Sequence, residues 1–72
     1  MDDTQKISFT VNGQVRAAAP GVTLLSYLQE LGVNLAEVVA EHNGNIVKPD
    51  SFGRHEIKSG DTVEFIHFVG GG

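Results

Sequence analysis

The last residues of the chain offer its clearest chemistry. Val69 is followed by Gly70, Gly71 and Gly72, and the only chemical group beyond that strand-like residue is the terminal carboxylate. Because glycine has no Cβ, such a segment can thread a narrow channel and bring its backbone close to a nucleotide. The chemistry open to it is that of the Gly72 carboxylate as an acyl group. The residues upstream decide whether this terminus is presented to a partner or is a frayed end.

Composition excludes several other chemistries. The 72 residues contain no cysteine, which rules out disulfides, iron–sulfur clusters and thiolate zinc sites. The three histidines lack metal-ligand spacing and are interpreted as ordinary polar residues. The net charge of −4 argues against nucleic-acid binding and favours a partner with a positive face. No apolar run reaches the roughly 20 residues of a membrane span, and the N-terminus lacks a signal-peptide pattern, so we expect a cytoplasmic protein without membrane contact.

The N-terminal segment predicts a β-hairpin. Apolar and polar residues alternate over residues 7–11, which is the pattern of a half-buried strand. Asn12-Gly13 follows, a strong signal for a two-residue hairpin turn. Residues 14–18 then form the return strand, in which we expect Val15 and Ala17 to face inward.

One convincing helix follows over residues 24–31. Thr23 can cap its start, and Gly32 stands where helices end in a left-handed residue. Four leucines form a single apolar stripe that we expect to pack on the sheet: Leu24, Leu25, Leu28 and Leu31.

The remainder of the chain reads as strands and turns. Residues 38–40 lead to a second hairpin turn at Asn43-Gly44, while Leu35 and Ala36 could form an extra helical turn. Residues 49–53 read as a turn or a short 3₁₀ helix with Phe52 at the core edge. Another tight turn at residues 59–61 precedes the last strand, residues 62–69.

This order of elements predicts a β-grasp fold. It is an α+β roll in which one main helix packs across a mixed sheet of four or five strands, with the first and last strands as central neighbours. Residues 1–69 would form the domain and residues 70–72 a flexible tail. If Val63 and Phe65 face the helix, alternation places Ile66 and Phe68 on the open face beside the tail. Exposed apolar residues there would mark a partner surface.

These features together resemble the ThiS family of ubiquitin-like sulfur carriers, which serve thiazole formation in thiamine biosynthesis. The resemblance covers nearly the whole chain. It is carried by residues 11–13, 23–25, 43–47, 59–61 and the Gly71-Gly72 terminus. The chain departs from many relatives at Gly70, where they have another small residue.

The resemblance implies a function in which Gly72 is the modified residue. A ThiF-like ATP-dependent adenylyltransferase would join AMP to its carboxylate, and a persulfide sulfur donor would then convert it to a thiocarboxylate. Thiazole synthase, a ThiG-like enzyme, would take the sulfur. Gly71 and Gly70 would give access to the narrow active site, and Phe68 and Ile66 would dock the partner. No catalytic constellation stands out in the sequence, so we expect a carrier that needs no cofactor and is not an enzyme.

Three other functions fit the same features. A molybdopterin sulfur carrier shares the fold and the di-glycine end, although such chains tend to be longer. A protein modifier would be joined through Gly72 to lysines of its targets. A non-covalent β-grasp binding module would not need its tail. A β-grasp ferredoxin is excluded by the lack of cysteine.

Overall fold

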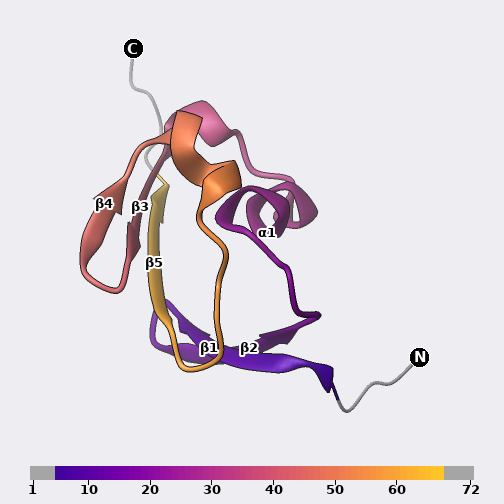
Figure 1. The fold of residues 1–72 in the computed structure, drawn as a ribbon. Coiled ribbons are helices and arrows are strands. Elements are labelled where there is room, and N and C mark those ends of the chain that lie inside the picture. Colours follow the sequence, from indigo (N-terminus) through magenta and orange to yellow (C-terminus); the bar gives the residue numbers. More distant parts are fainter. Residues whose placement is uncertain (1–4, 68–72) are drawn as a thin grey trace.

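The computed structural model describes residues 5–67, and residues 1–4 and 68–72 lie outside the described part. Within residues 5–67, one five-stranded sheet runs in the order β2-β1-β5-β3-β4, and one α-helix lies on one side of it (Figure 1). The strands are β1 (Ile7–Val11), β2 (Gln14–Ala18), β3 (Val38–His42), β4 (Asn45–Val47) and β5 (Thr62–His67). The helix is α1 (Leu24–Leu31). The predicted mixed sheet with one main helix is confirmed, with five strands.

The two hairpin turns form where the sequence predicted them. Asn12 and Gly13 have φ values of 50° and 82°, and Asn43 and Gly44 have 53° and 87°. A two-residue turn of this kind needs positive φ at both central positions, which Asn and Gly tolerate best. Each turn fixes the register of the strands that it joins.

The predicted faces of β2 are wrong. The Asn12-Gly13 turn places Val11 opposite Gln14, and the register continues with Phe9 opposite Arg16. Opposite residues in an antiparallel pair share a face, so Gln14 and Arg16 lie on the helix side with Phe9. Val15 therefore points to the open face and is 71% exposed. The register set by the turn decides which face of the sheet Val15 points to, even though Val15 is apolar.

Helix α1 is capped at both ends by its flanking residues. Thr23 Oγ1 accepts a hydrogen bond from the Ser26 N–H at 3.0 Å, and the Ser26 hydroxyl in turn accepts from the Thr23 N–H at 3.0 Å. Gly32 ends the helix in the left-handed conformation with φ 75°. This reciprocal capping satisfies N–H groups that a helix start leaves unpaired.

The leucine stripe of α1 is buried only in part. Leu24 and Leu28 are fully buried, and Leu25 packs against the core from its rim. Leu31 is 56% exposed, so its expected core position is wrong. It stands in the last turn of the helix, where it lines a surface hollow beside the sheet instead of entering the core.

Two 3₁₀ helices follow α1 within the described residues. The first, η2 (Leu35–Glu37), follows a cap in which Asn34 Oδ1 accepts the Ala36 N–H at 3.1 Å. It is therefore a separate turn and does not extend α1. The second, η3 (Pro49–Arg54), confirms the predicted 3₁₀ helix, and Phe52, which was expected at the core edge, lies fully buried in the core. No helix within residues 5–67 is long and apolar enough to cross a membrane.

Candidate functional site

The predicted site divides between described and undescribed residues. Phe68, Gly70, Gly71 and Gly72 lie outside residues 5–67, so the structure tests neither the tail nor Phe68. Ile66 is described, and it is 58% exposed on the face away from the helix. Val63, on the opposite face of the same strand, points toward the helix and is fully buried. The predicted facing of β5 is confirmed for these residues.

Strand β5 is held on both sides. It runs parallel to β1, with Thr62 opposite Thr10, and antiparallel to β3 over five residue pairs. The final strand is thus central, as predicted. Its last described residue, His67, lies opposite Val38 at the start of β3. Strand β5 therefore cannot shift without breaking two ladders.

The two turn asparagines extend these ladders with their side chains. Strand β1 pairs with β5 only as far as Val11, yet Asn12 Oδ1 accepts the Phe65 N–H at 2.8 Å and its Nδ2 donates to the Phe65 carbonyl at 3.2 Å. At the start of β5, Asn43 Oδ1 accepts the Thr62 N–H at 2.8 Å, while its Nδ2 donates to Asp61 Oδ1 at 3.2 Å. One residue type therefore forms each turn and also anchors the strand that leads to the tail.

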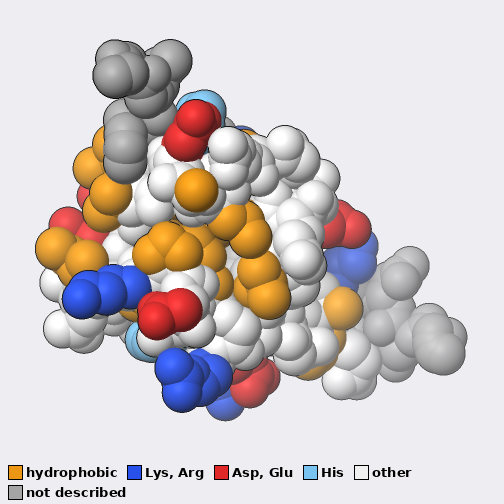
Figure 2. Space-filling view, turned by 90° about the horizontal axis from the view of Figure 1, so that it is seen from above, with side chains coloured by type: hydrophobic (Ala, Val, Ile, Leu, Met, Phe, Trp, Pro, Cys, Tyr) orange, Lys and Arg blue, Asp and Glu red, His pale blue; other side chains and the backbone are white. Residues whose placement is uncertain are grey.

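The open face of the sheet carries an apolar surface larger than predicted. Val39 lies opposite Ile66 and is 36% exposed, and Ile46 on the neighbouring edge strand β4 is 69% exposed. Figure 2 shows exposed hydrophobic side chains on the left of the molecule, the side on which Figure 1 places β3 and β4. The surface formed by Val39, Ile46 and Ile66 is called the open-face patch below. Val39 and Ile46 were missed, although their alternation with buried Val38 and Val47 was a usable signal.

Two carboxylates stand beside the open-face patch. Glu41 and Glu64 lie directly opposite each other on β3 and β5. Like charges in that position destabilise a sheet, because their Cβ atoms are only about 5 Å apart. The pair therefore offers a concentrated negative site to a partner with basic side chains. At the end of β5, His67 Nε2 lies 3.4 Å from Glu37 Oε1.

A polar cluster at the opposite end of β5 was not predicted. His42 Nε2 lies 2.7 Å from Asp61 Oδ2, and His42 Nδ1 lies 3.2 Å from His55 Nδ1. An ionised carboxylate only accepts, so Nε2 of His42 is the donor in the contact with Asp61. These residues come from three separate segments, so no local sequence pattern indicates the contact.

Asp61 is held in its charged form. Burial raises the pKa of Asp61, but hydrogen bonds from the Lys58 N–H, the His42 ring and the Asn43 amide outweigh it and hold the pKa below its usual value. The Lys58 N–H donates to Oδ2 at 2.8 Å. The cluster fixes the turn before β5. Among the described residues, no three side chains of His, Asp or Glu are grouped to hold a metal ion.

The arrangement of strands and helix is that of a known class of proteins. A mixed five-stranded sheet with one helix packed across it, two hairpins and a central last strand is the β-grasp architecture of ubiquitin-like proteins. Residues 9–72 match the sequence model of the ThiS family. The chain belongs to the ThiS family.

Solved structures agree with this assignment. The crystal structure of the thiamine biosynthesis protein ThiS from Geobacter metallireducens is 33% identical, with a TM-score of 0.77, and the match covers 92% of this chain and all of that one. An NMR solution structure of a thiamine biosynthesis protein from the same organism is 36% identical, with a TM-score of 0.72, over 92% of this chain and 88% of that one.

Similar curated proteins are much longer. The thiazole synthase of Paramagnetospirillum magneticum is 33% identical over 66 residues, which are 92% of this chain and 20% of the synthase. The thiazole synthase of Magnetococcus marinus is 34% identical over 62 residues, 86% of this chain and 19% of the synthase. The chain thus spans about a fifth of the length of these relatives.

Proposed function

We propose that this protein is a sulfur carrier of thiamine biosynthesis, in which the Gly72 carboxylate is adenylated, converted to a thiocarboxylate and used to supply sulfur to the thiazole. Membership of the ThiS family supports the carrier role. The structural observation that supports it best is the central position of β5, which ends at His67 only a few residues before Gly72. Because β5 is held by two neighbouring strands, it would hold the attachment point of residues 68–72 in place.

The proposed chemistry proceeds at the terminal carbonyl carbon. An oxygen of the Gly72 carboxylate attacks the α-phosphorus of ATP and pyrophosphate leaves, which gives an acyl adenylate. The terminal sulfur of a persulfide then attacks the carbonyl carbon and AMP leaves, which gives an acyl disulfide. A second thiol cleaves its S–S bond and releases the thiocarboxylate. All catalytic groups come from the partners, and the carrier supplies the acyl group.

The proposed partners are a ThiF-like adenylyltransferase, a protein that carries the persulfide, and thiazole synthase. The last is supported by the thiazole synthases of Paramagnetospirillum magneticum and Magnetococcus marinus, in which a similar sequence makes up about a fifth of the chain. A domain that works on an enzyme gains from being tethered to it, because tethering raises its effective concentration.

The open-face patch, with Phe68, is the proposed docking surface for the adenylyltransferase. Residues 68–72 span at most about 3.6 Å each, so the body must dock within roughly 18 Å of the reacting phosphate. Ile66 stands at the end of β5, where docking would place the tail closest to the active site. Glu41 and Glu64 would face basic side chains of the enzyme and speed the encounter.

Mass spectrometry tests the loading step. The full chain is incubated with a ThiF-like adenylyltransferase, ATP and sulfide, beside a chain that lacks Gly72. We expect the mass change of one oxygen-to-sulfur exchange in the full chain and no change in the truncated one. Equal exchange in both chains would refute the role of Gly72. An isopeptide adduct to lysine in place of the thiocarboxylate would indicate a protein modifier.

The docking step has a matched pair of variants. Ile66→Asp places a charge in the open-face patch, whereas Val15→Asp places the same charge on the same face of the sheet at another exposed position. We expect Ile66→Asp to reduce the rate of loading at limiting enzyme by about tenfold or more, about 1.4 kcal/mol, because docking would remove an unpaired charge from water. Val15→Asp should load normally. Equal losses in both variants would contradict docking through the patch.

A further inference from the structure

Strand β2 forms one edge of the sheet, with no strand on its outer side within residues 5–67. In the hairpin turn the Val11 carbonyl accepts the Gln14 N–H, and antiparallel pairs alternate between bonded and non-bonded. The backbone groups of Gln14, Arg16 and Ala18 therefore face β1. Those of Val15 and Ala17 point outward, and their N–H and C=O groups are called the β2 edge below.

The two edges of the sheet are protected differently. Strand β4 has three residues and is followed directly by Lys48 and Pro49. Shortness, lysine and proline are devices by which proteins keep an edge from pairing with another chain. Strand β2 has five residues, no proline and two alanines in its second half. Its backbone is accessible to another extended chain.

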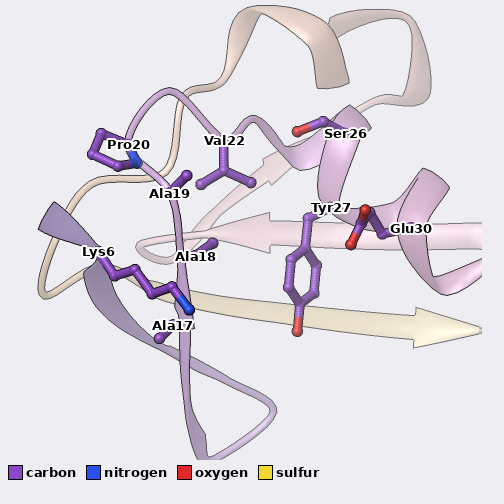
Figure 3. A pocket seen from close by; sticks show the side chains of 9 residues that line it. All are labelled: Lys6, Ala17, Ala18, Ala19, Pro20, Val22, Ser26, Tyr27 and Glu30. Carbon is purple, nitrogen blue, oxygen red and sulfur yellow. The ribbon is translucent and has the colours of Figure 1, made fainter. Parts of the chain in front are cut away.

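A hollow accompanies the β2 edge. It has a volume of about 440 Å³ and lies between β2 and α1, with Ala18, Val22 and Tyr27 among its lining residues. Figure 3 shows the Tyr27 ring pointing from the helix toward the sheet, with Ala17, Ala18 and Lys6 on the opposite side. A second hollow of about 400 Å³ also contacts Tyr27 and includes Leu31. Tyr27 lines both hollows, and β2 contributes to each, with Ala17 and Ala18 in the first and Gln14 and Arg16 in the second. The two hollows are together called the crevice below.

The second hollow is lined by Leu31, an apolar residue that lies outside the core. Leu31 is exposed there, beside half-buried Val33 and Phe65. Tyr27 is held by aromatic contacts on both sides, edge-on to Phe9 at 5.7 Å and stacked on Phe65 at 6.0 Å between ring centroids. The ring that both hollows share is therefore packed against two other aromatic rings.

The charges around the crevice differ in sign from those of the whole chain. Lys6 and Arg16 line its sheet side, and Glu30 is the one acidic residue among those that line either hollow. The protein as a whole carries a net charge of −4. This local excess of positive charge suits acidic side chains in a bound segment.

We propose that the β2 edge and the crevice bind an extended segment of a partner protein, one with alternate apolar side chains and acidic residues at its ends. The segment adds to the sheet as a sixth strand, and its backbone pairs with Val15 and Ala17. Main-chain hydrogen bonds give such binding its affinity, and side-chain pockets give it specificity. The β2 edge is separated from β5 by β1, and the crevice lies on the helix side of the sheet, so the inference does not depend on the tail chemistry or on the open-face patch.

NMR titration of the ¹⁵N-labelled full chain tests the proposal. The probe is the blocked peptide acetyl-Glu-Asp-Val-Ile-Val-Ser-Glu-amide, which has the proposed pattern. We expect saturable shifts at the amides of Val15, Ala17 and Tyr27, together with slower hydrogen exchange at Val15 and Ala17. The amide of Ile46, on the other edge, should not move. Absence of shifts at β2, or stronger shifts at Ile46, would overturn the proposal.

Two altered probes separate backbone pairing from simple apolar contact. A peptide N-methylated at alternate amides keeps its side chains but loses donors, and we expect it to bind at least about tenfold more weakly, about 1.4 kcal/mol. A peptide with lysine at its acidic positions should bind more weakly too, and Arg16→Glu should reduce that difference. Equal binding of the N-methylated and parent peptides would overturn strand addition.

A variant and a sedimentation experiment complete the test. Ala17→Pro removes one outward N–H and should abolish the shifts; should this variant not fold, the N-methylated peptide on the unchanged protein still decides. Sedimentation of the protein alone should show a monomer. Dimers that Ala17→Pro dissolves would show that a second copy occupies the β2 edge, and the peptide proposal would be wrong.

Discussion

At the scale of single residues, Asn12 and Asn43 each perform two tasks. Both adopt the positive φ that their hairpin turns require, and both use their side-chain amides to hold the backbone of β5. Glycine could form either turn, since it tolerates positive φ without strain. It could not supply the hydrogen bonds to Phe65 and Thr62. Asparagine at these two positions therefore serves to anchor β5 as well as to form the turns.

Asn12→Gly separates the two tasks. The turn is kept, but both hydrogen bonds to Phe65 are lost, and we expect a loss of about 1 kcal/mol in the free energy of unfolding. The Phe65 amide should also exchange its hydrogen faster than in the parent protein. Urea denaturation and hydrogen exchange measure the two effects. Unchanged exchange at Phe65 would contradict the anchoring role.

Asp61 predicts how stability depends on pH. Its pKa is lowered in the folded protein, so below about pH 4 the unfolded chain binds a proton more readily than the folded one. The contribution of Asp61 is therefore present above pH 4 and is lost as pH falls through the folded-state pKa. Urea midpoints from pH 6 to pH 2 should fall less steeply for Asp61→Asn than for the parent. Parallel profiles would show that Asp61 does not contribute.

At the scale of elements, α1 combines core and surface in one apolar stripe. Leu28 fills the core, while Leu31, one turn later, faces the crevice. Periodicity predicts that the two share a face of the helix. It does not say where the sheet beneath them ends, so the exposure of Leu31 could not be predicted from spacing.

Paired truncations measure this division of the helix. Leu28→Ala removes a fully buried side chain and should cost about 2–5 kcal/mol, a large share of the stability of so small a domain. Leu31→Ala removes an exposed one and should cost less than about 1 kcal/mol. Urea denaturation of the two variants provides the comparison. Similar losses would indicate that Leu31 is part of the core.

At the scale of the whole molecule, the local signals were the predictable ones. Asn12-Gly13, Thr23 and Gly32 each act on the nearest few residues, and all three form the predicted structure. The central position of β5 was also predicted, from the apolar character of the strand, but other features that depend on register or on distant contacts were missed. Val15 faces outward because a turn fixed the pairing, and the contact of His42 with Asp61 joins segments that are distant in sequence. The tail and Phe68 stay predictions, because they lie outside the described residues.

The acidic character of the whole chain can be tested at Glu64. Because Glu64 lies opposite Glu41, Glu64→Gln should raise the free energy of unfolding by about 0.2–1 kcal/mol. The same change should slow association with the adenylyltransferase at low salt, since it removes a steering charge. Stopped-flow association at two salt concentrations measures the second effect. If Glu64→Gln lowered the stability and also sped association, both the repulsion between Glu64 and Glu41 and the steering role of Glu64 would be contradicted.

Transfer of labelled sulfur tests the central claim most directly. The full chain is loaded with isotopically labelled sulfur at Gly72, separated from the loading enzymes and mixed with thiazole synthase and its other substrates. We predict that the label appears in the thiazole product, with one carrier thiocarboxylate consumed for each ring formed. A thiazole product without label, formed while the carrier keeps its sulfur, would contradict the account.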